Sequence, residues 1–405
     1  MSYITVTRCR LCDQKLSPPA LVLEDQPAAN NLCESEDAAL SAPRYPLALA
    51  RCPGCTSVQL TTTIDPWVLF GDYSYVPTGA AFAAHWEELT AVVGPPKGLA
   101  VEIGSNQGDL LAALKGNGWD VLGVEPAKHL AAKANDRGLT ALPTFFDEQT
   151  AGAIASDHGR AALVVATNVM AHIHDLHGAV RAVKRLLAPD GRFVFEVASL
   201  ESDYAKGSFD RVCYFEHVFS HSVTPLAHLF SAHGMAITNV EEIQFHGGSL
   251  RVTVEHGARH ADEIYARARC ESLPGQVATA AALDSFALLT HRTISTVRDA
   301  LADLRRSGKR VVGFTAPAKA SVLLNAAGVG QATIQYIADD NPLKVGSYVP
   351  GAGIPIVPVS SLLEDHPDVV VVFAWNLADT LIPLLPRGHW LRVVIPMPTW
   401  REVIV

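Results

Sequence analysis

The chain has 405 residues, which is enough for two or three domains. Its hydrophobic fraction of 49% and charged fraction of 18% are those of an ordinary soluble globular protein. The net charge of −9 argues against RNA or DNA as the partner, because nucleic-acid binding usually needs a basic face. No run of about 18 apolar residues occurs, and the first residues lack the apolar core of a signal peptide. We therefore expect a cytoplasmic protein with no membrane-spanning segment.

The first 70 residues are rich in proline and cysteine and show little helical period. Four of the seven cysteines form two Cys-x-x-Cys pairs, Cys9 with Cys12 and Cys52 with Cys55. In a cytoplasmic protein such pairs are typical metal ligands, and four thiolates form a closed tetrahedral site for structural Zn²⁺. Two unrelated thiol pairs or a redox-active Cys-x-x-Cys are the alternatives.

Residues from about 75 to 255 alternate helical patterns with short apolar runs. Four of these runs, 101–103, 121–125, 162–168 and 192–198, predict buried parallel strands. Each is followed by a helix pattern, so the region predicts a doubly wound α/β sheet.

A second α/β series follows a region, 260–308, that is predicted to be mainly helical. Its strand candidates are KRVVGFTA, TIQYIADD, DVVVVFAW and RVVIP, and they predict a second, smaller Rossmann-like domain. We therefore expect a zinc-binding domain at 1–70, a first α/β domain at 71–258, and a helical linker with the second α/β domain at 259–405.

A glycine-rich loop follows the first strand of the larger α/β region. The segment LAVEIGSNQGDLL at 99–111 contains a strand, a loop from Gly104 to Gly108 and the start of a helix. The glycines let the backbone approach a ligand at the carboxyl end of the sheet. The next strand ends in Glu125, about 20 residues later, where a carboxylate accepts hydrogen bonds from ribose hydroxyls. Both NAD and S-adenosylmethionine (SAM) fit these features.

Further details favour SAM over NAD. Glu102 precedes the loop, as in many methyltransferases, and the third glycine of the dinucleotide motif GxGxxG is missing. Asn168 ends the strand predicted at 162–168, where the methionine part and the substrate are expected. Phe145 to Asp147 are expected near the adenine. The expected cofactor contacts are Glu102, Gly104, Ser105, Asn106, Gly108, Glu125, Pro126, Phe146 and Asn168.

A polar cluster follows the core strand predicted at 192–198, in DRVCYFEHVFSHS at 210–222. Tyr214, Glu216 and His217 together can remove a proton from carbon and stabilise the resulting oxyanion. His172 is expected on the same rim, and His246 with Gly247 suggests a loop against a ligand. The chain has 16 histidines, so a hydrogen-bonded rim or core histidine is the alternative for each of them.

The order of these motifs closely resembles that of the sugar C-methyltransferases of deoxysugar biosynthesis. The resemblance covers nearly the whole chain and rests on CxxC…CxxC, VEIGSNQGDLL, GVEPA, NVMAHI, YFEH, HGGSLRV and FTAPAKASVLLN. Three details depart from the family pattern: Phe215 replaces a histidine, Gln107 replaces an aspartate, and the late motif reads GFTAPAKA instead of GYGAPAKG.

The resemblance implies an α/β protein. It consists of a class I methyltransferase Rossmann-like domain, an N-terminal zinc-binding module and a second, C-terminal Rossmann-like domain that shapes the substrate cleft. It implies transfer of a methyl group from SAM to a carbon of a nucleotide-linked 4-keto-6-deoxyhexose, with thymidine as the expected nucleoside and C3 as the expected position. C5 also flanks the ketone and is the nearest alternative.

The resemblance also implies roles for individual residues. His217 is the expected general base, Tyr214 and Glu216 position or polarise the sugar, and His172 assists near the ketone or a hydroxyl. Tyr75 is a further expected catalytic residue, with Tyr73 as the competing choice. The expected substrate contacts are His246, Gly247 and Lys319. Lys319 would meet a diphosphate, or it is a surface lysine at a helix start.

Two alternatives come from other functional classes. One is a non-catalytic protein that binds a nucleotide-sugar and SAM, against which the intact Glu125 and Tyr-x-Glu-His cluster argue. The other is an RNA methyltransferase with a zinc module, against which the acidic charge argues. We expect a monomer or a weak homo-oligomer, with neither nucleic acid nor membrane as a partner.

Overall fold

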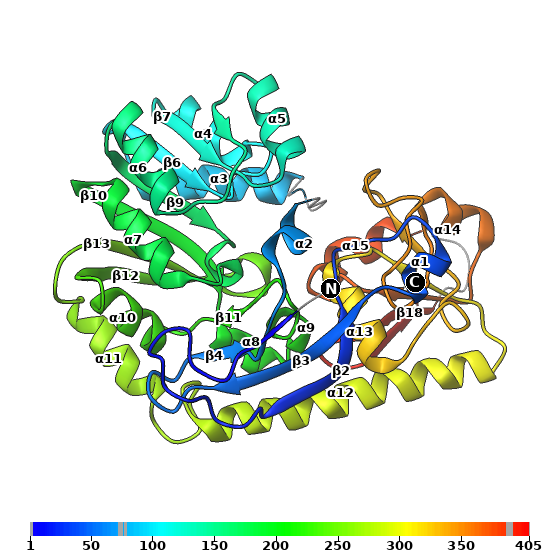
Figure 1. Ribbon diagram of the computed structural model, residues 1–405. Coiled ribbons are helices and arrows are strands. Elements are labelled where there is room, and N and C mark those ends of the chain that lie inside the picture. Colours follow the sequence, from blue (N-terminus) through cyan, green and yellow to red (C-terminus); the bar gives the residue numbers. More distant parts are fainter. Residues whose placement is uncertain (1–2, 72–75, 77–78, 386–391, 405) are drawn as a thin grey trace.

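The computed structural model describes residues 3–71, 76, 79–385 and 392–404, and these form three bodies (Figure 1). The described strands form a seven-stranded, a six-stranded, a four-stranded and a two-stranded sheet. None of the described helices is both long and apolar enough to cross a membrane.

The N-terminal module is built on an antiparallel sheet of order β11-β4-β3-β2. Its elements are β1 (Ile4–Thr5), β2 (Leu21–Pro27), α1 (Glu36–Leu40), β3 (Arg44–Arg51), β4 (Val58–Leu60), β5 (Thr62–Thr63) and α2 (Pro66–Phe70). The fourth strand, β11 (Phe219–Ser220), comes from far along the chain and pairs Phe219 with Gln59. The segment that carries His217 is therefore tied to the N-terminal sheet.

The central domain contains the seven-stranded sheet, of order β12-β13-β10-β9-β6-β7-β8. Its strands are β6 (Leu99–Ile103), β7 (Asp120–Val124), β8 (Ala141–Leu142), β9 (Ala161–Thr167), β10 (Leu187–Ala198), β12 (Met235–Ile243) and β13 (Ser249–His256). Only β13 runs antiparallel to its neighbours β10 and β12 among the described strand pairs of this sheet. The four strands predicted from the sequence are β6, β7, β9 and β10, and their parallel pairing confirms the prediction.

Helices cover both faces of this sheet because its strands are apolar on both sides. On β9, Leu163 and Val165 pack toward α3 and α4, whereas Val164 and Ala166 pack toward the helices of the opposite face. The helices are α3 (Ala80–Val93), α4 (Asp109–Gly116), α5 (Lys128–Asp136), α6 (Glu148–Asp157), α7 (Leu176–Leu186) and α10 (Val223–Ser231). Two short helices, α8 (Leu200–Lys206) and α9 (Phe209–Val212), follow β10 and precede the segment that carries Tyr214 and His217.

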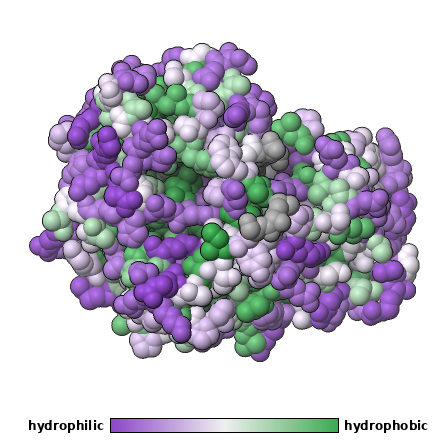
Figure 2. All heavy atoms as spheres, in the orientation of Figure 1, coloured by the Kyte–Doolittle hydropathy of each residue, from purple (hydrophilic) through white to green (hydrophobic). Residues whose placement is uncertain are grey.

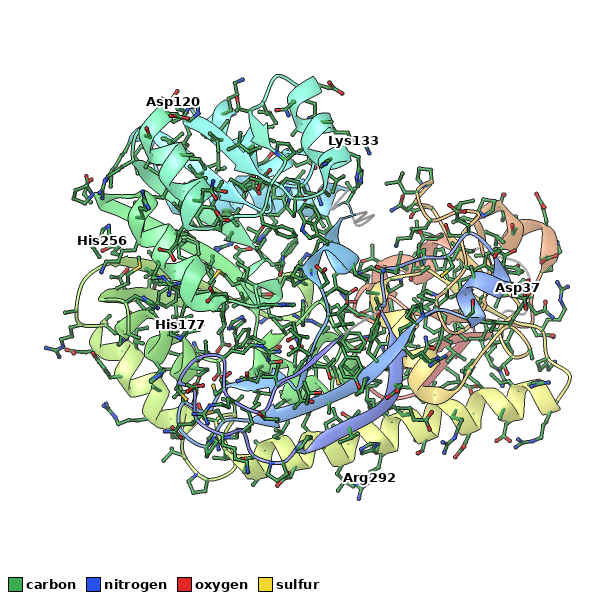
Figure 3. All side chains as sticks on the ribbon, viewed as in Figure 1. Asp37, Asp120, Lys133, His177, His256 and Arg292 are labelled. Atoms are coloured by element: carbon green, nitrogen blue, oxygen red, sulfur yellow. The ribbon has the colours of Figure 1, made fainter. Side chains whose placement is uncertain are left out.

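The predicted helical region forms α11 (Asp262–Glu271) and α12 (Ala280–Arg306). Helix α12 has 27 residues, so it is about 40 Å long. Its buried positions recur every three or four residues, from Leu283 to Leu304, and give it one apolar face. The opposite face carries exposed charged residues such as Arg292, which points away from the protein (Figure 3). Helix α12 therefore runs along the base of the molecule from the central domain to the C-terminal domain (Figure 1).

The C-terminal domain has a sheet of order β16-β15-β14-β17-β18-β19, parallel except for β19. Its elements are β14 (Val311–Phe314), α13 (Ala318–Ala327), β15 (Ile337–Asp339), β16 (Ile356–Pro358), α14 (Ser360–Asp365), β17 (Val369–Val372), α15 (Ala378–Leu381), β18 (Arg392–Ile395) and β19 (Arg401–Ile404). The four strands predicted here are β14, β15, β17 and β18, so the second Rossmann-like domain is confirmed. Strands β16 and β19 were not anticipated, because both are short and partly exposed.

One hydrophobic core connects the N-terminal module, helices α9 and α12, and the C-terminal sheet. Leu47 of β3, Phe209 of α9, Phe286 of α12 and Val371 of β17 all belong to it. The two outer bodies are therefore packed together rather than linked only by the chain.

Candidate active site

The four predicted metal ligands lie together in the N-terminal module. The sulfurs of Cys9, Cys12, Cys52 and Cys55 all lie within 4.8 Å of one another. Tetrahedral Zn²⁺ bound through sulfur at about 2.3 Å needs sulfurs about 3.8 Å apart, which this donor set fits. The backbone N–H of Leu11 and the side-chain amide of Gln59 donate to Cys9 Sγ at 3.3 and 3.2 Å. These donors stabilise a thiolate, so the cluster is a structural zinc site with a closed ligand set.

A cavity of about 500 Å³ opens at the carboxyl ends of the central strands. Eight of the nine predicted cofactor residues line it: Glu102, Gly104, Ser105, Asn106, Glu125, Pro126, Phe146 and Asn168. Figure 2 shows the molecule hollowed near its middle, where hydrophobic residues gather between hydrophilic ones. The end of the sheet is where a nucleotide-like ligand binds in a doubly wound fold.

The carboxylate of Glu125 is held in place by backbone N–H groups, one of them from the glycine-rich loop. Its two carboxylate oxygens accept backbone N–H groups of Asn106 and Ala127, each at 2.8 Å. Each oxygen keeps a second lone pair, so the fixed carboxylate can accept ribose hydroxyls. Burial raises the pKa of Glu125 above its ordinary value, and the two backbone donors oppose that rise.

Glu102 tests whether the cavity suits SAM. It is buried and lines the cavity, and its Oε2 has no hydrogen-bond partner among the described residues. Burial first, and then the nearby Glu125, raise the pKa of Glu102 well above its ordinary value. A buried acceptor without a partner fits a cationic ligand group, and SAM carries an ammonium and a sulfonium.

The two loop glycines serve different purposes. Gly104 has φ of 70°, and a Cβ there would come within 2.5 Å of Val169 at the cavity floor. Gly108 also has positive φ, but its missing Cβ makes room for Leu139 and Ala134. Gly108 lies outside the cavity lining and allows α4 to pack against α5, and its contact with the cofactor stays a prediction.

The predicted catalytic rings form a row beside the cavity. His172, in the short turn after β9, stacks on Phe70 of α2 with ring centres 5.2 Å apart. The ring of His217 lies 5.1 Å beyond His172, and Tyr214 lies 4.4 Å from His217. His172 lines the cavity, whereas His217 and Tyr214 lie outside its lining. The structure thus brings the three residues together at one edge of the cofactor cavity.

His217 is held in one tautomer. Its Nδ1–H donates to the backbone carbonyl of Arg211 at 2.7 Å, which leaves a lone pair on Nε2. The atoms packed around the ring, and then the charge of a protonated His172, lower the pKa of His217 well below its ordinary value. The imidazole is therefore neutral at pH 7 and can accept a proton.

Glu216 is anchored by the N-terminal module. Its Oε1 accepts the backbone N–H and the side-chain amide of Asn30, at 3.2 and 3.0 Å. Its Oε2 is buried and has no partner among the described residues, and burial raises its pKa to about 7. Glu216 can therefore present a carboxyl oxygen to a hydroxyl of a bound molecule.

His246 and Gly247 lie on a loop held by cations. Lys206 Nζ donates to the Gly247 carbonyl at 2.6 Å, and Arg211 Nη2 donates to the Gly248 carbonyl at 3.2 Å. His246 lines the cavity, whereas Gly247 does not. Burial, followed by the positive charges of Lys319 and Arg211, lowers the pKa of His246 to about 3.

Lys319 lies between the central and C-terminal domains, outside the cavity lining. Its Nζ donates to Asn376 Oδ1 at 2.9 Å and lies 5.1 Å from the ring centre of Trp375. Burial lowers its pKa to about 8, and the nearby Asp210 opposes this shift. Lys319 is thus a half-buried lysine at the start of α13, and its contact with a diphosphate stays a prediction.

Several contacts were missing from the sequence prediction. Trp67 and Phe70 of α2, and Phe82 and Trp86 of α3, line the cavity, and Asn30 holds Glu216. An apolar residue in a helix gives no signal that distinguishes a cavity wall from a core position.

Two further residues of the sequence analysis need comment. Tyr75 and its competing choice Tyr73 lie outside the described residues. Phe215, which departs from the family pattern, packs edge-on against Tyr45 in the hydrophobic core. Phe215 therefore faces the N-terminal sheet, while its neighbour Tyr214 faces His217.

Comparison with protein families gives three matches along the chain. Residues 9–70 match a putative zinc binding domain, residues 83–240 a methyltransferase domain, and residues 244–396 the C-methyltransferase C-terminal domain. C-methyltransferase NovU of Streptomyces niveus is 34% identical over 414 aligned residues, covering 98% of this chain and 97% of NovU.

Solved methyltransferase structures resemble less than half of the chain. N-methyltransferase NodS from Bradyrhizobium japonicum WM9 has 15% identity and a TM-score of 0.34, covering 44% of this chain and 95% of NodS. The SAH-bound magnesium protoporphyrin IX methyltransferase ChlM from Synechocystis PCC 6803 has 12% identity and a TM-score of 0.34, covering 44% of this chain and 88% of ChlM.

The alignment with NovU covers all three bodies of the fold. The four-cysteine cluster lies in the segment that matches the zinc binding domain, and most of the cavity lining lies in the segment that matches the methyltransferase domain. This protein belongs to the family of SAM-dependent C-methyltransferases, with a class I methyltransferase domain between a zinc-binding module and a C-terminal Rossmann-like domain.

Proposed function

We propose that this C-methyltransferase acts on a nucleotide-linked 4-keto-6-deoxysugar and adds the methyl group to a carbon beside the ketone. C3 is our first choice and C5 the alternative, and thymidine diphosphate is the expected nucleotide. The observation that carries the proposal is the fixed tautomer of His217, whose Nε2 is free of the hydrogen bond made by Nδ1. Carbon methylation beside a ketone needs a base that is unprotonated, with a lone pair available, before it takes the proton.

The reaction follows from the chemistry of the ketone. The C4 carbonyl acidifies the hydrogen on the neighbouring carbon, and Nε2 of His217 takes that proton. The electrons of the broken C–H bond move to the carbonyl oxygen and give an enolate. SAM, when bound, supplies an electrophilic methyl group whose departure leaves a neutral thioether. The enolate carbon takes that methyl group, so the protein's main task is alignment and stabilisation of the enolate oxygen.

The surrounding residues suit the other parts of such a substrate. Tyr214 and Glu216 can orient the sugar, since one lies against His217 and the other keeps a buried oxygen without a partner among the described residues. Lys319 and Arg211 supply positive charge for a diphosphate near the loop of His246. Asp203 pairs with Arg211 at 3.1 Å, but burial raises the pKa of Asp203 to about 7 and reduces its opposing charge.

A turnover screen tests the proposal. Thymidine-diphosphate 4-keto-6-deoxy sugars would be incubated with SAM and the purified protein, and the products read by mass spectrometry. Parallel substrates would carry deuterium at C3 or at C5. Loss of the C3 label with gain of a methyl supports C3, loss of the C5 label supports the alternative, and methyl gain with both labels retained refutes methylation beside the ketone.

A further inference from the structure

Trp67 is a large aromatic residue at the wall of the cofactor cavity that neither the sequence motifs nor the mechanism uses. It lies on α2, which belongs to the N-terminal module, and yet it lines the cavity of the central domain. Its surface is 51% exposed, which is unusual for a tryptophan without a function.

The position of Trp67 along the cavity can be read from the strand order. Glu102 lies near the carboxyl end of β6, Asn168 follows the adjacent strand β9, and Glu125 follows β7. Phe145 and Phe146 follow β8, which is the outer strand on that side. A ligand whose ribose meets Glu125 and whose charged end meets Glu102 therefore places its base over Phe145 and Phe146.

Trp67 lies at this outer end. Its ring centre is 4.7 Å from that of Phe145, in an edge-on arrangement. The cavity wall here consists of Phe145 and Phe146 from the central domain and Pro66 and Trp67 from α2. Every nucleobase offers a π face, so an indole beside a phenyl ring is a suitable stacking surface for adenine.

The helix that carries Trp67 is connected to the catalytic residues. Asn31 donates to the Val68 carbonyl of α2 at 3.0 Å, while the adjacent Asn30 binds Glu216. Phe70, one turn beyond Trp67, stacks on His172. We propose that Trp67 is a cofactor-binding residue that covers the adenine of SAM, so that the cofactor is clasped between the zinc-binding module and the central domain.

Binding of S-adenosylhomocysteine tests this proposal without a sugar or turnover, and so independently of the function proposed above. Isothermal titration should give a dissociation constant about 5- to 150-fold higher for Trp67→Ala than for the unmodified protein. Trp67→Phe should recover most of the loss, because a phenyl ring still stacks. The control Trp400→Phe changes the tryptophan that immediately precedes β19 and should leave the dissociation constant unchanged.

Intrinsic fluorescence gives a second readout. S-adenosylhomocysteine should change the tryptophan emission of the unmodified protein, and most of that change should be missing in Trp67→Phe, with the remainder from Trp86. An unchanged dissociation constant in Trp67→Ala would overturn the proposal. If Trp67→Ala also bound thymidine diphosphate more weakly, that result would indicate that Trp67 stacks on the base of the substrate instead. The thermal midpoint of each variant verifies that it is folded.

Discussion

His217 owes its expected role to one hydrogen bond. Because Nδ1–H is donated to the Arg211 carbonyl, Nε2 carries the lone pair before any substrate binds. The sequence could suggest a base from the spacing of Tyr214, Glu216 and His217, but it could not give the tautomer, since the acceptor is a backbone carbonyl six residues away.

Replacing the base tests its role. His217→Asn should lower turnover by about 10²- to 10⁴-fold, the usual contribution of a general base. Affinity for S-adenosylhomocysteine should remain, because His217 lies outside the cavity lining. In the unmodified protein the loss of activity from protonating His217 should occur well below pH 6.5, since its pKa is lowered. Full turnover in the variant would show that another group removes the proton.

Glu216 should affect stability in a pH-dependent way. Burial raises its pKa to about 7 in the folded protein, so between its unfolded pKa and pH 7 the folded state binds more protons than the unfolded state. The contribution of this group to the free energy of unfolding therefore falls as pH rises from about 4.5 to 7 and is constant above.

Glu216→Gln should remove this dependence. The thermal midpoint of the variant minus that of the unmodified protein should increase steadily between pH 5 and 7.5. Glu201→Gln, which changes an exposed carboxyl, is the matched control and should show no such trend. A pH-independent difference between Glu216→Gln and the unmodified protein would contradict the raised pKa.

At the scale of elements, α3 is pinned over the cofactor cavity by buried charges. Glu196 of β10 accepts from His85 of α3 at 2.6 Å and from Arg251 of β13 at 2.8 Å, and Arg251 also binds Glu88 of α3. His85 stacks on Phe245 with ring centres 3.6 Å apart. This arrangement positions Phe82 and Trp86, the cavity residues of the same helix.

Arg251→Met should disturb both stability and cofactor binding. Breaking a buried ion pair and leaving its partner charged costs about 3–5 kcal/mol, which far exceeds the median for an exposed pair, about 0–1 kcal/mol. We expect a clearly lower thermal midpoint and a higher KM for SAM. Arg259→Met removes an exposed pair with Asp262 and should change neither. Equal behaviour of the two variants would refute the positioning role of the buried cluster.

The zinc site is connected through β4 to the segment that carries His217. Gln59 of this strand binds Cys9 Sγ and pairs with Phe219 of β11, two residues beyond His217. Across the cluster, His177 of α7 donates to the carbonyl of Leu11, which lies between Cys9 and Cys12 in the sequence. The metal therefore stabilises the contact between the N-terminal module and the central domain.

Loss of the metal should reduce stability and turnover together. Cys9→Ser should lower the zinc content, the thermal midpoint and kcat, because metal binding contributes directly to folding. Cys270→Ser, at an exposed cysteine outside the cluster, is the control. Unchanged kcat in a Cys9→Ser protein shown by metal analysis to lack zinc would contradict this link.

At the scale of the whole molecule, the predictable part of the fold is the part set by local pattern. Apolar runs gave the parallel strands of both α/β domains, and the cysteine spacing gave the zinc site. The contacts that join the bodies were not predictable. Asn30 of the N-terminal module and Glu216 lie 186 residues apart, and within the central domain His85 and Glu196 lie 111 apart. A sequence pattern reports which residues are apolar or polar, but such pairings depend on how three bodies pack.

The same limit applies to the site. Motifs located eight cofactor residues that line one cavity, because each follows a strand whose end the fold fixes. The motifs gave no signal that Gly108 and Phe215 pack against residues of other elements. The N-terminal module supplies Trp67 and Phe70 to a cavity otherwise lined by the central domain, and its Asn30 holds Glu216.

The most direct test of the central claim is the position of the transferred methyl group. The protein would be given SAM labelled with ¹³C in its methyl group and a thymidine-diphosphate 4-keto-6-deoxysugar, and the product would be analysed by two-dimensional NMR. We predict that the labelled methyl is bonded to a ring carbon and correlates with the C4 carbonyl. A labelled methyl bonded to oxygen or nitrogen, or no transfer to any such sugar, would contradict the account.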